Sequence, residues 1–188
     1  MTIRIVACSN DNGTGITSVV DKLVHDCYVE ECDPTISRDW SYKLVIDGKL
    51  YELKILEISE LYETGVEWAI KTYDIVLIVC AHDESYSHSQ FTEMFKKIRE
   101  IKGSNDAPIV VCFNKCDIEH LYSPSEIKEL IGDESIPFFD VSAKTGQGIK
   151  GLFEKLARMI IEKQELESKT ENKEKKKTSG DKEVCVIQ

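Results

Sequence analysis

The sequence contains no long hydrophobic run and has a deficit of positive charge. Its longest uninterrupted apolar segment, residues 75–81, is much shorter than the roughly 20 residues that a membrane-spanning helix needs. The formal net charge of -10 argues against nucleic acid as the main partner, because a phosphate backbone attracts basic surfaces. The N-terminus lacks the charged-then-apolar layout of a secretory signal, and Thr2 stands where N-myristoylation requires glycine.

Metal-ligand spacing is also missing. The seven cysteines, an odd number without a signal peptide, fit a reducing compartment, and the spacings Cys112 to Cys116 and Cys27 to Cys32 are poor zinc patterns. The four histidines show no ligand spacing, and we expect them at the surface or half-buried: His25, His82, His88 and His120. Trp40 and Trp68 are expected to be packing groups.

Apolar segments that predict strands alternate with segments of helical periodicity. The predicted strands are residues 3–8, 40–46, 50–58, 75–81, 109–113 and 137–141. The predicted helices are residues 14–25, a short one around Trp68, 91–101, one from a Ser125 cap to 131, and 149–160. Because Asp47-Gly48 predicts a hairpin, we expect an α/β fold: a mostly parallel six-stranded sheet with one antiparallel edge hairpin strand and helices on both faces.

Residues 10–17, NDNGTGIT, join the first predicted strand to the first helix. A turn that opens a helix presents backbone N–H groups and the helix N-terminus to an anion. Against the phosphate-loop pattern G-x-x-x-x-G-K-[ST], Gly15 and Thr17 fit, whereas Asn10 and Ile16 do not. No Lys or Arg lies between residues 5 and 21 to replace the missing lysine. The segment therefore has the frame of a phosphate-binding loop without its cation.

Four further segments carry a family resemblance. They are DPTI (33–36), IDGK (46–49), NKCD (114–117) after one apolar strand and SAK (142–144) after another. In this order, over residues 2–163 and the last four, the sequence resembles a Ras-family small GTPase, with the P-loop GTPase fold. The resemblance implies GTP or GDP with Mg²⁺ as ligands, and protein effectors and regulators as partners.

The resemblance assigns the ligand-binding positions. For nucleotide they are Asn12, Gly13, Thr14, Gly15, Ile16, Thr17, Ser18, Tyr28, Val29, Thr35, Asn114, Lys115, Asp117, Ser142, Ala143 and Lys144. For Mg²⁺ they are Thr17 and Thr35, with Glu57 contacting a metal-bound water.

At the base, Asp117 would accept the two guanine donors, N1–H and the exocyclic amine. The N–H of Ala143 would meet guanine O6, and Tyr28 would lie against the base edge. Asn114 and Lys115 would tie the loop together and cover the ring, while Ser142 and Lys144 brace the second loop.

The phosphate end departs from the family. Ile16 stands at the position of the lysine that bridges the β- and γ-phosphates, and Glu60 at that of a glycine whose N–H meets the γ-phosphate. Leu61 occupies the position of the catalytic glutamine and cannot orient a water. We therefore predict impaired GTP hydrolysis with no intact catalytic residue. Ser37 and Arg38, where Ras itself carries acids, predict partners other than the usual Ras effectors.

We expect two parts: a Ras-like G domain over residues 1–163 and a disordered tail over residues 164–188, which lacks any apolar period. The tail ends in Cys185-Val186-Ile187-Gln188, a C-a-a-X box that predicts a prenyl group on Cys185. The basic run around residues 173–177 would supply a second membrane signal. The predicted location is the cytoplasmic face of a membrane, and the membrane that we expect is the plasma membrane.

Two functions remain open. In the first, the protein is a membrane-anchored G protein that binds guanine nucleotide and hydrolyses GTP poorly or not at all. In the second, it is a pseudo-GTPase, a nucleotide-independent interaction module at a membrane. An efficient self-sufficient GTPase would need a cation from elsewhere, such as a partner's arginine.

Overall fold

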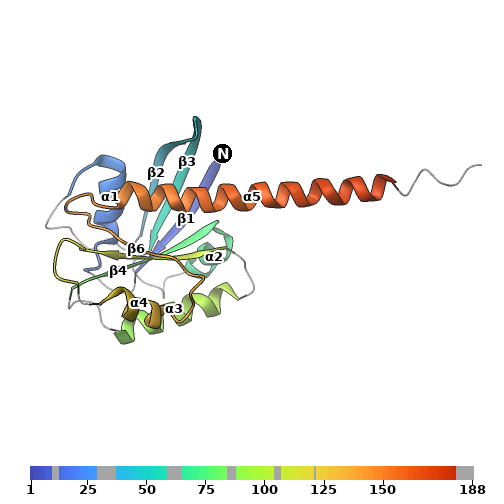
Figure 1. Cartoon of the computed structure of the whole chain (residues 1–188). Coiled ribbons are helices and arrows are strands. Elements are labelled where there is room, and N and C mark those ends of the chain that lie inside the picture. The colour runs from blue at the N-terminus through green and yellow to red at the C-terminus, as the bar shows by residue number, and fades with distance from the viewer. Residues whose placement is uncertain are drawn as a thin grey trace, which may run out of the picture.

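A six-stranded sheet lies at the centre of the computed structural model, which describes residues 1–9, 13–28, 37–58, 65–83, 88–103, 107–120 and 122–180, with only the backbone for 37, 88 and 171–180 (Figure 1). The strands are β1 (Thr2–Cys8), β2 (Ser37–Ile46), β3 (Lys49–Ile58), β4 (Ile75–Ala81), β5 (Ile109–Asn114) and β6 (Phe138–Asp140). Their order is β2-β3-β1-β4-β5-β6. Among the described strands, β2 and β3 form the one antiparallel pair, so the predicted sheet is confirmed.

Helices cover both faces of the sheet. They are α1 (Ile16–His25), α2 (Val66–Thr72), α3 (His88–Lys102), α4 (Pro124–Ile131) and α5 (Ile149–Gly180). The side chains of α1 and α5 pack on one face, and those of α2, α3 and α4 pack on the other. No helix among the described residues is long and apolar enough to cross a membrane.

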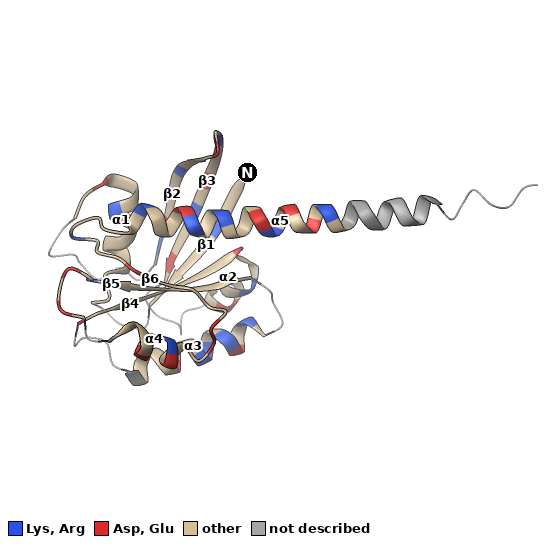
Figure 2. Ribbon diagram, in the orientation of Figure 1, with Lys and Arg blue, Asp and Glu red and all other residues tan. Residues whose placement is uncertain are grey.

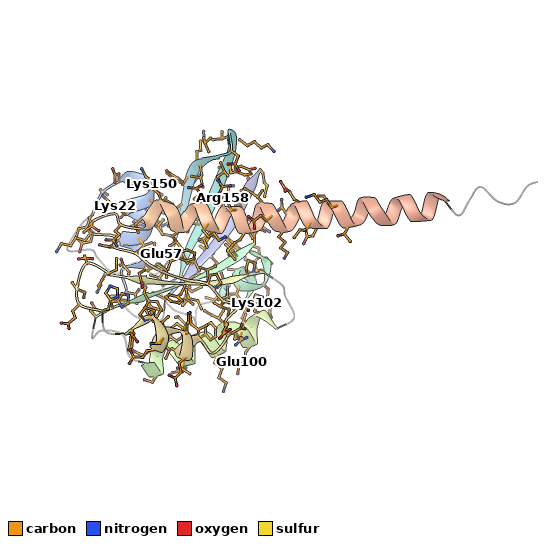
Figure 3. The ribbon with its side chains drawn as sticks, viewed as in Figure 1. Lys22, Glu57, Glu100, Lys102, Lys150 and Arg158 are labelled. Atoms are coloured by element: carbon orange, nitrogen blue, oxygen red, sulfur yellow. The ribbon has the colours of Figure 1, made fainter. Side chains whose placement is uncertain are left out.

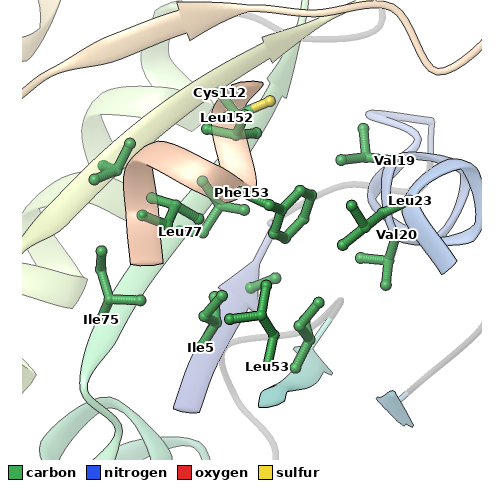
Figure 4. Close-up of a cluster of buried hydrophobic side chains, with 14 of the residues drawn as sticks. Ile5, Val19, Val20, Leu23, Leu53, Ile75, Leu77, Cys112, Leu152 and Phe153 are labelled. Carbon is green, nitrogen blue, oxygen red and sulfur yellow. The ribbon is translucent and has the colours of Figure 1, made fainter. Parts of the chain in front are cut away.

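Central strands are apolar at consecutive positions because both of their faces are covered. In β1, Ile5 joins the cluster beneath α1 and α5, while Val6 joins the cluster above α3 and α4. Figure 4 shows the first cluster, in which the ring of Phe153 from α5 lies among side chains of α1 and the sheet. Outside the cluster, Arg158 of α5, labelled in Figure 3, makes a two-pronged ion pair with Asp47 at the β2–β3 turn. The two nitrogen–oxygen distances are 2.8 and 3.2 Å.

Helix α5 continues to Gly180, so the prediction of disorder from residue 164 is wrong for residues 164–180. This stretch contains no proline, and it carries Glu165–Lys169 and Glu171–Lys175 at the i,i+4 spacing that favours helix. It has no apolar stripe to pack, so the helix runs out beyond the sheet with both charge signs along its described part (Figure 2). Residues 181–188, including Cys185, lie outside the described residues.

Two local expectations are also wrong. The N-cap of α4 is Ser123, not Ser125, because Glu126 three residues further on completes a capping box with it. Trp68 is not a packing group: it is 62% exposed on α2, where its ring meets Tyr73 edge-on.

Candidate functional site

Three loops meet at the carboxyl ends of the parallel strands, where ligands bind in such sheets. Asn114, at the end of β5, joins them. Its buried amide nitrogen donates to the carbonyl oxygen of Thr14 in the loop after β1, at 3.0 Å. Its Oδ1 accepts a hydrogen bond from the backbone N–H of Ala143 after β6, at 3.0 Å. One side chain therefore holds the phosphate-loop segment and both predicted base loops in register.

The contact with Asn114 requires glycine at position 15. Gly15 has φ +76°, in the left-handed region, and precedes the first turn of α1. A Cβ there would lie 2.5 Å from Nδ2 of Asn114. The phosphate-loop segment can approach the base loop this closely only because the residue has no side chain.

The carboxylate of Asp117 is held in one orientation. The hydroxyl of Ser142 donates to Oδ1 of Asp117 at 2.5 Å and accepts the N–H of Thr145 at 3.1 Å. Ser142 is fully buried, whereas Asp117 is exposed, so an anchored carboxylate faces the surface of the site. This is the group that the sequence analysis assigned to guanine.

The other base-site residues are placed differently from the detailed expectations. The N–H of Ala143, expected to meet guanine O6, is engaged by Asn114. The amine of Lys115 pairs with Asp83, which follows β4. Lys144 is exposed. Tyr28 is also exposed, just after α1. Their assignment to nucleotide stays a prediction.

At the metal end, Thr17 and Glu57 are joined. The hydroxyl of Thr17 donates to Oε1 of Glu57, and the indole N–H of Trp40 donates to Oε2 at 3.2 Å. Glu57 lies inside the domain (Figure 3). Since a hydroxyl that gives away its proton keeps its lone pairs, Thr17 remains able to ligate Mg²⁺, and the residues present fit such an ion.

Trp40 was expected only to pack. It does pack against the core beneath α1, but it also donates a hydrogen bond to the second oxygen of Glu57. The register of the hairpin gives the signal: Trp40 is opposite Ile55, so it is the diagonal neighbour of Glu57, within reach of a long aromatic side chain. The guanidinium of Arg38, opposite Glu57, lies over the Trp40 ring at 5.0 Å.

Burial raises the pKa of Glu57 above its ordinary 4.5, while the hydrogen bonds from Thr17 and Trp40 act in the opposite direction. A carboxyl group with a raised pKa in the folded state binds its proton more tightly there than in the unfolded chain. The free energy of unfolding therefore decreases as pH rises from about 4.5 through the folded-state pKa.

We expect Glu57→Gln to flatten that decline in stability. The measurement is urea unfolding from pH 4 to 8, compared with Glu52→Gln, the same change at a half-buried position on the same strand. A pH dependence that survives Glu57→Gln unchanged would contradict the assignment.

The sequence places Ile16 among the nucleotide-binding positions, but its side chain points into the core and not toward the phosphate-loop turn. Its side chain is 5% exposed and belongs to the cluster beneath α1 and α5. Near it, Oγ1 of Thr14 is buried without a hydrogen-bond partner among the described residues. The loop thus offers backbone groups and an unpaired hydroxyl, but no cation.

Several predicted positions lie outside the described residues: Asn12, Val29, Thr35, Glu60 and Leu61. Gly13 and Ser18 are described and flank the phosphate-loop turn, with Gly13 at φ +134°.

The strand order and the loops at the carboxyl ends define an α/β P-loop GTPase fold, as predicted. A family model described as "Ras family" matches residues 6–162, and the chain therefore belongs to the Ras family of small GTPases. Family membership supports binding of guanine nucleotide and the use of protein effectors and regulators.

Proposed function

We propose that this protein is a membrane-anchored Ras-like G protein that selects guanine nucleotide and hydrolyses GTP weakly or not at all. The observation that carries the proposal is the set of hydrogen bonds in which Asn114 and Ser142 hold the predicted base loops. Buried, fully paired polar groups fix a loop in one arrangement. Such an arrangement is what selective recognition of a base needs.

Selectivity follows from the oriented carboxylate. Asp117 would accept hydrogen bonds from the two guanine donors, and both would be charge-assisted. Adenine presents an acceptor, its N1, at the corresponding position, so the carboxylate would meet a lone pair. Thr17 and Thr35 would hold Mg²⁺, with Glu57 contacting a metal-bound water, and the ion when bound neutralises phosphate charge.

Weak hydrolysis follows from missing groups. Ile16 lies in the core and supplies no charge to the β- and γ-phosphates. The sequence also places Leu61 where a glutamine would orient the attacking water. Transition-state charge would therefore be stabilised by backbone groups and Mg²⁺ alone.

We expect Asp117→Ala to lower affinity for GDP by roughly 100-fold or more, because two charge-assisted hydrogen bonds of about 1.5–3 kcal/mol each are lost. Calorimetric titration with GDP and ADP would measure both affinity and selectivity. Glu119→Ala, an exposed acid in the same loop, is the matched control and should leave both unchanged. A parent protein that binds ADP as tightly as GDP would refute the proposal.

The membrane part of the proposal rests on the C-terminal box and on α5. Residues 164–180 extend the helix by about 25 Å at 1.5 Å per residue, which would hold the G domain away from a lipid surface. We propose a prenyl group on Cys185 and a location at the cytoplasmic face of the plasma membrane. Cys185→Ser should move the protein into the soluble fraction; Cys27→Ser, at an exposed cysteine of the domain, should not.

The burial of Ile16 favours a second candidate, a pseudo-GTPase that acts as a fixed interaction module. Ile16, at the position of the phosphate-binding lysine, is part of the core cluster. The loop therefore lacks the positive charge that would attract the nucleotide phosphates. Chromatography of the nucleotide released from purified, denatured protein separates the candidates. Stoichiometric GDP or GTP supports the G protein, and its absence supports the module.

A further inference from the structure

Two histidines and an aspartate meet beside the base loops, although the sequence shows no ligand spacing for them. The expectation of a surface or half-buried position is wrong for His82, which is buried, while His120 is exposed as expected. His82 follows β4, His120 follows the 114–117 loop and Asp140 ends β6. Because β4, β5 and β6 are neighbours in the sheet, residues far apart in sequence arrive at one edge. Ligand atoms of the three side chains lie within 4.8 Å of one another.

His82 is a buried ligand with one nitrogen unused. Its Nε2 lies 2.9 Å from Oδ1 of Asp140, and its ring packs on Phe113 with centroids 5.3 Å apart. Its Nδ1 is buried and has no hydrogen-bond partner among the described residues. Whichever nitrogen carries the proton, one polar ring atom remains unpaired in the interior, and such atoms are rare in native structures.

His120 provides the movable ligand. Its exposed ring stacks on His82 with centroids 4.1 Å apart and planes 17° from parallel. In two stacked, nearly parallel rings the nitrogen lone pairs point in parallel directions and do not converge on one ion. Joint ligation therefore requires the His120 side chain to rotate out of the stacked arrangement. Its ring also makes a marginal contact, 3.4 Å from the carbonyl oxygen of Cys116.

We propose that His82, His120 and Asp140 bind a transition-metal dication, with Zn²⁺ as the best match. Zinc bonds of 2.0–2.2 Å in tetrahedral geometry place donor atoms about 3.4 Å apart. The present atoms lie within 4.8 Å of one another, so no pair needs to close by more than about 1.4 Å, a change that rotation of His120 would supply. Nε2 of His82 and Oδ1 of Asp140, now 2.9 Å apart, would separate by about 0.5 Å. Two imidazoles and one carboxylate select zinc over Mg²⁺, which prefers oxygen ligands, and a water would complete the four.

A metal here would pin the edge on which the base loops rest. The backbone N–H of His82 donates to the backbone carbonyl oxygen of Asn114 at 3.0 Å. Asp140 comes two residues before Ser142. The ion would therefore tie the end of β4 to both base loops. Zinc binding itself does not depend on nucleotide binding, so failure of one proposal leaves the other standing.

The test is a zinc titration of the full, chelator-treated chain in competition with a chromophoric chelator. We expect one ion per chain with a Kd in the micromolar range or tighter, and visible absorption from Co²⁺ bound at the same site. His120→Ala and Asp140→Asn should each weaken Zn²⁺ binding by about 100-fold or more, because each removes a direct ligand and loss of an outer-shell partner alone costs roughly 10- to 100-fold.

The matched control is His25→Ala, which removes a histidine from a second group of possible ligands, Asp21, His25 and Cys27, at the end of α1. It should leave zinc affinity unchanged. His82→Phe, which keeps a ring against Phe113, provides a second ligand deletion, and thermal unfolding without metal checks the fold of each variant. A parent that binds Zn²⁺ only above 100 µM, or His120→Ala binding as tightly as the parent, would overturn the proposal.

Discussion

Replacing Gly15 with alanine is expected to destabilise the domain by roughly 2–4 kcal/mol. Part of this, about 1–2 kcal/mol, is the cost of placing a side chain at φ +76°. The rest comes from the contact: the new Cβ would lie 2.5 Å from Nδ2 of Asn114, so the amide must move and lose its hydrogen bond to Thr14. Urea unfolding would measure the change.

Gly48→Ala is the control that separates these two terms. Gly48, in the β2–β3 turn, has the same φ of +76°, but nothing lies within 4 Å of the position a Cβ would take. It should show the conformational cost alone. Equal losses of stability in the two variants would mean that Asn114 adjusts at no cost and does not hold the loops together.

Gly15→Ala should also weaken GDP binding, by roughly 10-fold or more, because one lost hydrogen bond of about 1–3 kcal/mol couples the loop to the base site. Gly48→Ala should leave GDP affinity unchanged, since its turn lies at the opposite end of β2 from the site.

The sheet could be predicted because each element carried a local signal. The apolar run of β4 and the Asp47-Gly48 turn each admit one interpretation, and alternation of strands with helices dictates a parallel sheet. The loops that meet at its carboxyl edge follow from that topology alone. The hydrogen bonds within these loops could not be predicted in the same way. The bond from the backbone N–H of Ala143 to Asn114, for example, joins residues 29 positions apart.

The misjudged positions share a cause, which is that sequence spacing says nothing about distance in space. His82 and Asp140 are 58 residues apart yet 2.9 Å from each other. The tail shows the converse error, because absence of an apolar face excludes packing but not helix formation. Charged residues with good helix propensity and i,i+4 pairs can extend a helix already nucleated by its packed N-terminal half.

Ile16 is the position where the two candidate functions part. Lysine there must either bury its ammonium group in the cluster beneath α1 and α5 or swing out and leave a gap. Without nucleotide, we expect Ile16→Lys to lower stability by about 2–4 kcal/mol, a decrease in Tm of roughly 4–16 °C for a domain of this size.

Nucleotide should reverse that loss if the loop is a phosphate site. A lysine that leaves the core can donate charge-assisted hydrogen bonds to the phosphates, each worth about 1.5–3 kcal/mol. We therefore expect Ile16→Lys to bind GDP roughly 10- to 100-fold more tightly than the parent, with a larger gain in Tm on GDP addition. Ile16→Met, with an uncharged chain of similar length, controls for repacking.

The comparison of Lys with Met at position 16 gives a decision either way. Tighter binding by the lysine variant alone means that the backbone frame of residues 13–17 still fits phosphate and that the natural protein has a weakened nucleotide site. Equal binding, or none, means that the frame no longer accepts phosphate even when its cation is restored. The burial of Ile16 would then belong to a domain with one fixed conformation. Such a domain would bind its protein partners without a nucleotide-dependent switch.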